Sequence, residues 1–86
     1  MIETHYPNTL HLIIASVGEK LYDAAVLSAT FPGTEGAFTV LPHHEAFVSI
    51  LKAGTIKVRT TIDGDKDFPI DGGVLEISDN RAVVLL

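Results

Sequence analysis

The side chains best suited to metal binding or catalysis are adjacent in the middle of the chain: His43, His44 and Glu45. Imidazole nitrogens and carboxylates are ligands that zinc, manganese and iron accept in proteins. Adjacent side chains on an extended segment point to opposite faces, however, so His43 and His44 are poorly placed to share one ion. His5 and His11 lie too far away in the sequence to be assigned as partners. We therefore expect no metal site, and a small metal- or sugar-dependent β enzyme using these three residues is kept only as an alternative.

The sequence gives even less support to other catalytic or ligand-binding motifs. The four serines belong to no G-x-S-x-G motif and the chain has no cysteine, so nucleophilic catalysis is not predicted. The segment 33–36 is too short for a phosphate-binding loop, and no G-K-[ST] follows it. The acidic set Asp63, Asp65 and Asp67 does not have the glycine and the final glutamate of a calcium loop, and a solvated hairpin tip explains it better. We expect no catalytic residue, no cofactor and no metal.

Short segments between Gly and Pro residues must position these side chains. None of these segments exceeds about a dozen residues, which favours an all-β sandwich or barrel over a helical protein. Residues 10–17 are apolar and β-branched, as in a strand. Residues 54–62 alternate, with Ile56 and Val58 on one face and charged residues on the other, which is the period of a half-buried strand.

Turn signals connect the predicted strands. Asp63-Gly64 predicts a hairpin that returns through Pro69, and this proline indicates an edge strand or a bulge. Gly72-Gly73 predicts a tight bend or a close backbone approach. Residues 74–78 and 82–86 are expected to form a final hairpin.

Two segments, 21–29 and 47–52, contain helix formers. We expect strands in both, because both are short and bounded by Pro or Gly.

The length and charge of the chain exclude further classes of function. The chain has 86 residues, which is enough for one domain spanning residues 1–86. Eleven acidic and six scattered basic residues give a net charge of −5, so a nucleic-acid partner is not expected. No apolar run approaches the roughly 20 residues of a membrane span and no signal peptide is visible, so we expect a cytoplasmic chain without direct membrane insertion. Composition and spacing alone favour a binding or structural part.

The run from Leu27 to Glu45, LSATFPGTEGAFTVLPHHE, closely resembles the epsilon subunit of F-type ATP synthases, whose amino-terminal domain carries a PGxEGxxxVLPxH stretch. Three further blocks are similar in the same order. Residues 10–16 resemble the opening strand, 51–58 (LKAGTIKV) the LKPGxxxV strand, and 70–77 (IDGGVLEI) the xxGGxLEV segment. Together the blocks cover nearly the whole chain.

Three positions depart from the family pattern. Thr39 and His43 stand where the family often has glycine, and Ala53 stands where it usually has proline. Because glycine often supplies a positive φ at such sites, we expect these turns to differ slightly here.

The resemblance implies a flattened β-sandwich of about ten short, mostly antiparallel strands. It also implies a non-catalytic rotor subunit of the ATP synthase central stalk, which clamps the gamma subunit to the membrane c-subunit ring. Rotation driven by proton or sodium flow would then power ATP synthesis by the whole complex. The expected location is peripheral, at the cytoplasmic face of the bacterial plasma membrane.

The resemblance also assigns contact residues. Contact with the c-ring is expected from one loop, formed by Gly33, Thr34, Glu35, Gly36, Ala37 and Phe38, where Glu35 would pair with a basic or polar loop of the ring. Contact with the gamma subunit is expected from Pro42, His43, His44, Ala46, Phe47, Gly73 and Val74. Of the apolar residues around these loops, namely Phe31, Phe38, Val40, Leu41, Phe47 and Val48, we expect a minority to face gamma and the rest to be core. A free-standing protein-interaction domain is a further alternative, since fold alone does not fix function.

Longer members of the family carry a carboxy-terminal helical hairpin, which can inhibit hydrolysis and in some bacteria binds ATP through an I/L-D-x-x-R-A motif. Residues 77–82, ISDNRA, resemble this motif only superficially, because the spacing from Asp79 to Arg81 is one residue short. We expect no ATP site there. Because the sequence ends at Leu86, where longer relatives enter the helical hairpin, we also expect a coupling module without inhibitory helices.

Overall fold

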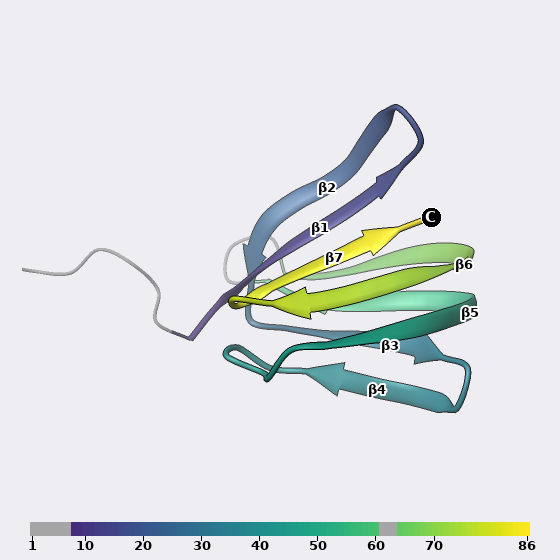
Figure 1. Cartoon of the computed structure of the whole chain (residues 1–86). Coiled ribbons are helices and arrows are strands. Elements are labelled where there is room, and N and C mark those ends of the chain that lie inside the picture. Colours follow the sequence, from purple (N-terminus) through teal and green to yellow (C-terminus); the bar gives the residue numbers. More distant parts are fainter. Residues whose placement is uncertain (1–7, 61–63) are drawn as a thin grey trace, which may run out of the picture.

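The computed structural model describes residues 8–60 and 64–86, which form strands joined by short turns and contain no helix (Figure 1). The strands are β1 (Leu10–Ser16), β2 (Glu19–Val26), β3 (Ser28–Gly33), β4 (Gly36–Val40), β5 (Phe47–Arg59), β6 (Asp65–Ser78) and β7 (Arg81–Leu85). The all-β prediction is confirmed. The two segments that contain helix formers lie in β2, β3 and β5, as expected.

All seven strands belong to one mixed sheet with the order β2-β1-β7-β6-β5-β3-β4. The pairs are antiparallel except that of β1 with β7, which is parallel. The described residues thus contain fewer strands than the ten or so that the resemblance implied. The reason is that β5 and β6 are 13 and 14 residues long and continue through positions where separate short strands were expected.

The two long strands bend together and fold the sheet into two layers. Their register runs from Lys52↔Gly72 to Gly54↔Ile70, and Figure 1 shows both strands turning back at the same end of the molecule. The β3 layer contains β3, β4 and residues 54–59 and 65–70. The β1 layer contains β1, β2, β7 and residues 47–52 and 72–78.

Glycines permit the close backbone approaches near this bend. A Cβ on Gly54 would lie 2.8 Å from the Cβ of Pro32, and a Cβ on Gly73 would lie 2.7 Å from the carbonyl oxygen of Leu85. Neither position has room for a larger residue without a backbone shift. The bend and close approach predicted at Gly72-Gly73 are therefore confirmed.

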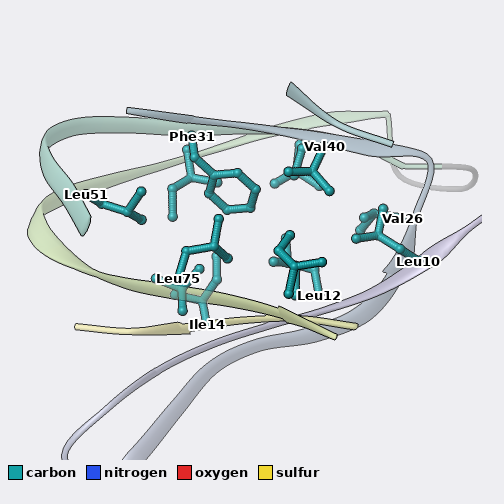
Figure 2. Close-up of a cluster of buried hydrophobic side chains, with 14 of the residues drawn as sticks. Leu10, Leu12, Ile14, Val26, Phe31, Val40, Leu51 and Leu75 are labelled. Atoms are coloured by element: carbon teal, nitrogen blue, oxygen red, sulfur yellow. The ribbon is translucent and has the colours of Figure 1, made fainter. Parts of the chain in front are cut away.

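The core lies between the layers, where alternate side chains of each strand point inward (Figure 2). Phe31 and Val40 of the β3 layer point toward Leu12 and Leu75 of the β1 layer, and Leu51 fills the end of the core beside the bend. The fully buried set has no polar member among the described residues. The alternation predicted for β5 is confirmed, because Ile56 and Val58 are buried whereas the charged residues beside them are exposed.

Half-buried aromatic side chains pack against the core at its two open sides. On one side the rings of Tyr22 in β2 and Phe68 in β6 have centroids 4.9 Å apart. On the other side Phe38 in β4 and Phe47 in β5 are 5.7 Å apart. Each aromatic pair connects the border strand of one layer to the border strand of the other. The edge strands β2 and β4 have no further strand paired to them in the sheet, so side-chain contacts rather than backbone pairing close the two sides of the sandwich.

Both predicted hairpins are present. β5 and β6 pair from Arg59↔Asp65 onward, although Asp63 of the predicted turn lies outside the described residues. β7 pairs only with residues 74–78 of β6, so Pro69 lies on the border of its layer, as its residue type predicted. The β6–β7 turn has positive φ at both central residues, Asp79 (50°) and Asn80 (59°), as in the primed turns that suit the twist of hairpins.

Candidate binding surfaces

The loop expected to meet the c-ring is the tip of the β3–β4 hairpin. Gly33 pairs with Gly36, so Thr34 and Glu35 form a two-residue turn, and residues 34–37 are exposed. The backbone N–H of Thr34 donates a hydrogen bond of 3.2 Å to the carbonyl oxygen of Ile50. The tip is therefore tied to β5 and projects in a fixed direction.

The two ends of this predicted set are not exposed. Gly33 is buried, and a Cβ there would lie 2.8 Å from both the Phe38 ring and the carbonyl oxygen of Gly36. Phe38 is half-buried against Phe31 and Phe47, with ring centroids 5.8 Å and 5.7 Å away. Of the six residues, only Thr34, Glu35, Gly36 and Ala37 offer much surface to a partner.

The segment expected to contact gamma begins in the β4–β5 connection, residues 41–46. Pro42 is half-buried, whereas His43, His44 and Ala46 are exposed. The His44 ring packs on Phe47 at a centroid distance of 5.0 Å, and its Nδ1 donates a hydrogen bond of 2.8 Å to the carbonyl oxygen of Glu45. Phe47 itself points into the sandwich, so the aromatic contacts run from the exposed loop into the core.

His43 has a left-handed backbone, with φ of 65°. The resemblance led us to expect glycine here, and the backbone has the left-handed conformation that glycine favours even though the residue is histidine. Thr39 and Ala53, the other two departures, do not have positive φ. The Thr39 hydroxyl instead lies 2.7 Å from that of Thr30, its cross-strand partner. That these turns differ slightly from those of the family stays a prediction.

Apolar side chains line the outside of the β1 layer. The register places Ile50, Val74 and Leu85 side by side on three adjacent strands, and these residues are 59%, 40% and 58% exposed. In the neighbouring row Val48, which is 66% exposed, and Val83 lie on either side of Glu76, an exposed carboxylate of β6. We refer to this surface as the outer apolar face, formed by Ile13, Ala15, Val48, Ile50, Val74, Val83 and Leu85.

The structure divides the predicted gamma set between two places. Val74 lies in the outer apolar face, with Gly73 beside it, at the end of the layer near the β3–β4 tip. Pro42, His43 and His44 lie at the other end, near the β6–β7 turn, as a hydrogen bond from His43 to Asn80 shows. Residues 48–50 of β5 connect the two places. Of the outer apolar face, the sequence singled out Val74, whereas its neighbours Ile50 and Leu85 are identified only by the strand register.

A polar cluster borders the outer apolar face along β2. The Asp23 carboxylate is hydrogen-bonded to Nε2 of His11 and accepts a bond of 2.8 Å from Nζ of Lys20. The hydrogen bond from Lys20, with that from His11 next in importance, lowers the pKa of Asp23 below its ordinary value. Asp23 pairs in register with Ile13 and Lys20 with Ala15, so charged groups flank the apolar residues. An apolar centre with a polar border is the anatomy of protein–protein interfaces.

The alternative metal-dependent enzyme gains no support. Across residues 8–60 and 64–86, no three His, Asp or Glu side chains converge as a ligand set. Asp65 and Asp67 lie opposite Arg59 and Lys57 on neighbouring strands, where opposite charges favour strand pairing. Residues 77–82, which superficially resemble an ATP-binding motif, form the β6–β7 turn and the strand ends that flank it. The described part of the chain also contains no helix that could cross a membrane.

Residues 9–86 match the family of the β-sandwich domain of the ATP synthase delta/epsilon chain. The chain belongs to this family. Among its relatives, the ATP synthase epsilon chain of Nitratiruptor sp. is 39% identical over 80 residues, and that of Campylobacter fetus subsp. fetus is 36% identical over 80 residues. Each alignment covers 92% of this chain and 61% of the relative, so the chain spans about three fifths of the length of these relatives.

Solved structures share the fold of this ATP synthase family domain. One similar chain comes from the Euglena gracilis mitochondrial ATP synthase, in a structure of OSCP, F1 and c-ring, with a TM-score of 0.84 and 22% identity over 96% of this chain and 53% of that one. Another comes from the central stalk and c-ring of the Tetrahymena thermophila mitochondrial ATP synthase, with a TM-score of 0.70 and 18% identity over 87% of this chain and 60% of that one. At these identities the similarity concerns the fold.

Proposed function

We propose that this chain is a central-stalk rotor subunit of an F-type ATP synthase and that it couples the gamma subunit to the membrane c-ring. The observation that carries the proposal is the family match over residues 9–86. The fold that the chain shares with chains from one structure of OSCP, F1 and c-ring and from another of a central stalk and c-ring supports it.

The gamma subunit is the partner proposed for the β1 layer. Protein interfaces have apolar centres that exclude water and polar borders, and a few apolar or aromatic residues contribute most of the binding energy. The outer apolar face supplies Ile50, Val74 and Leu85 at such a centre, while His11 and Asp23 supply a border. The loop residues Pro42, His43, His44 and Ala46 extend the same interface toward the β6–β7 turn.

The c-ring is the partner proposed for the β3–β4 tip. Thr34, Glu35, Gly36 and Ala37 are polar or small, and they present little surface for a large apolar interface. A contact of this kind gives orientation and association rate more than affinity. Glu35 is placed to pair with a basic or polar loop of the ring, and an exposed pair contributes only about 0–1 kcal/mol.

The proposed role is mechanical. The chain performs no catalysis and binds no cofactor, and rotation that begins in the ring passes through a stiff sandwich to gamma. Whether protons or sodium ions drive rotation is determined by the c-ring and not by this chain. The proposed location follows from these partners: the cytoplasmic face of the bacterial plasma membrane, peripheral, as part of the complex.

Calorimetric titration of the chain with the isolated gamma subunit of the same ATP synthase tests this function. The proposal predicts saturable binding in a one-to-one complex that also co-elutes in gel filtration. If the titration shows no heat of binding and the two proteins do not co-elute, the proposed binding to gamma is refuted. A free-standing interaction domain would then be favoured.

A further inference from the structure

Asn80 connects three segments that are far apart in the sequence. Its side-chain oxygen Oδ1 accepts a hydrogen bond of 2.7 Å from the backbone N–H of His43, which is 37 positions earlier. Its Nδ2 donates a bond of 2.9 Å to the carbonyl oxygen of Thr9, which is 71 positions earlier. One half-buried amide thus joins the β6–β7 turn to the β4–β5 loop and to the residue that precedes β1.

The hydrogen bond from the His43 N–H is made at the loop residue whose backbone has a positive φ. Among the described residues, the non-glycine positions with positive φ are His43, Asp79 and Asn80 itself. Such conformations cost free energy and persist when surrounding contacts fix them. The Asn80 amide supplies such a contact, because it binds the N–H of the residue whose backbone is left-handed.

The conformation of His43 determines what the loop presents to a partner. His44 follows directly, and its ring packs on Phe47 at the start of β5. If His43 left the left-handed region, the chain direction at His44 would change, and with it the position of both histidines relative to the outer apolar face. Asn80 lies between β6 and β7, two strands of that face, so it relates the loop to the face.

We propose that Asn80 is a positioning residue for the gamma contact. It acts through His43, by holding residues 41–46 in the conformation that presents His43 and His44, and does not need to touch gamma itself. This inference rests on the proposed function and adds a residue outside the contact set predicted from the sequence.

The test compares Asn80→Gly with Asp79→Gly. Glycine tolerates the positive φ of this turn, so Asn80→Gly removes the side chain while the turn geometry is retained. Asp79 has a φ of 50° in the same turn and its side chain is exposed, so Asp79→Gly is the matched control. Two quantities are measured for each variant: amide hydrogen exchange at His43, and gamma affinity by calorimetry at a temperature where circular dichroism shows the variant to be folded.

We expect Asn80→Gly to accelerate exchange of the His43 amide at least tenfold and to weaken gamma binding about tenfold, with neither effect in Asp79→Gly. Asn80→Asp keeps an acceptor for the His43 N–H but loses the donor to Thr9. It should therefore recover most of the His43 protection and of the gamma affinity. This variant also provides the comparison if Asn80→Gly does not fold.

Wild-type gamma affinity in Asn80→Gly, with His43 unprotected, would overturn this inference and leave the proposed function intact. So would Asn80→Asp that protects His43 yet binds gamma as weakly as Asn80→Gly. A wild-type chain that does not bind gamma would instead refute the proposed function, and this inference with it.

Discussion

The rings of Tyr22 and Phe68 meet at a centroid distance of 4.9 Å and an interplanar angle of 51° across the open side of the sandwich. Tyr22 belongs to the border strand of the β1 layer and Phe68 to the border segment of the β3 layer, and no backbone ladder joins them in the described residues. Side-chain packing therefore closes this side, and Phe38 with Phe47 closes the other.

Replacing both Tyr22 and Phe68 should reveal their coupling. Aromatic pairs contribute about 0.5–1.5 kcal/mol beyond the area they bury. In a double-mutant cycle with Tyr22→Leu and Phe68→Leu, the free energy of unfolding measured in urea should show a coupling of about 1 kcal/mol. The control cycle pairs Tyr22→Leu with Phe38→Leu, on opposite sides of the molecule, and should be additive to within about 0.5 kcal/mol. Equal coupling in the two cycles would show that the Tyr22–Phe68 contact has no special role.

The Asp23 cluster should make stability depend on pH. The pKa of Asp23 is lowered in the folded state by Lys20 and then by His11, whereas in the unfolded chain it should be near the ordinary value of about 3.9. The stabilisation is thus fully present above about pH 4, and it is lost as the pH falls through the folded-state pKa. We expect the melting temperature to fall further between pH 6 and pH 3 in the wild type than in Asp23→Asn.

Asp71→Asn is the control for this pH dependence, because Asp71 is an exposed carboxylate on β6. It should leave the wild-type pH profile nearly unchanged. If Asp23→Asn has the same profile as the wild type, the hydrogen bonds of Asp23 do not contribute to stability.

Ile50→Asp tests the outer apolar face. Ile50 is 59% exposed, so the substitution should change the free energy of unfolding by less than about 1 kcal/mol. It places an unpaired charge at the centre of the proposed gamma interface, where loss of a central contact costs more than about 1.4 kcal/mol, a factor of ten in affinity. Calorimetry should show gamma binding at least tenfold weaker.

Val17→Asp is the control for the added charge, since Val17 is 98% exposed in the β1–β2 turn and is not one of the residues that form that face. It should bind gamma as the wild type does. Equal loss of affinity in both variants would indicate a general effect of charge, and no loss in Ile50→Asp would exclude this face as the gamma site.

Glu35→Lys tests the β3–β4 tip. We expect slower association with the c-ring, by several-fold at low salt, because the charge on an interface border mainly changes the association rate. Surface plasmon resonance on rings in nanodiscs measures this rate. Glu19→Lys, an exposed residue at the start of β2, provides the same charge change elsewhere. Association that is unaffected by Glu35→Lys and equally fast in both variants would remove Glu35 from the proposed contact.

Local pattern predicted much of the fold. The alternation around Ile56 and Val58 identified the buried face of β5 before any pairing was known, and Gly72-Gly73 identified the place where backbones approach. These features depend on neighbouring residues only. The continuation of β5 and β6 through a shared bend depends on how the two strands pair with each other. No local pattern in the sequence reveals this register.

The candidate site was less predictable for the same reason. Ile50, Val74 and Leu85 become neighbours only because β5, β6 and β7 pair in one particular register, and a shift of one residue would send them to the other face. Phe47, one of the residues predicted to contact gamma, is half-buried against Phe38, and this packing across the sandwich has no local signature in the sequence. The bond between His43 and Asn80 joins segments 37 residues apart and has no local signature.

If this chain joins gamma to the c-ring, as we propose, the ring should retain more gamma in the presence of the chain. Detergent-purified c-rings are immobilised, and fluorescent gamma is passed over them with and without the chain. We expect the ring to retain at least tenfold more gamma with the wild-type chain, and much less of this gain with either Ile50→Asp or Glu35→Lys. Gamma retention that is the same with and without the chain would show that the chain does not join these two partners.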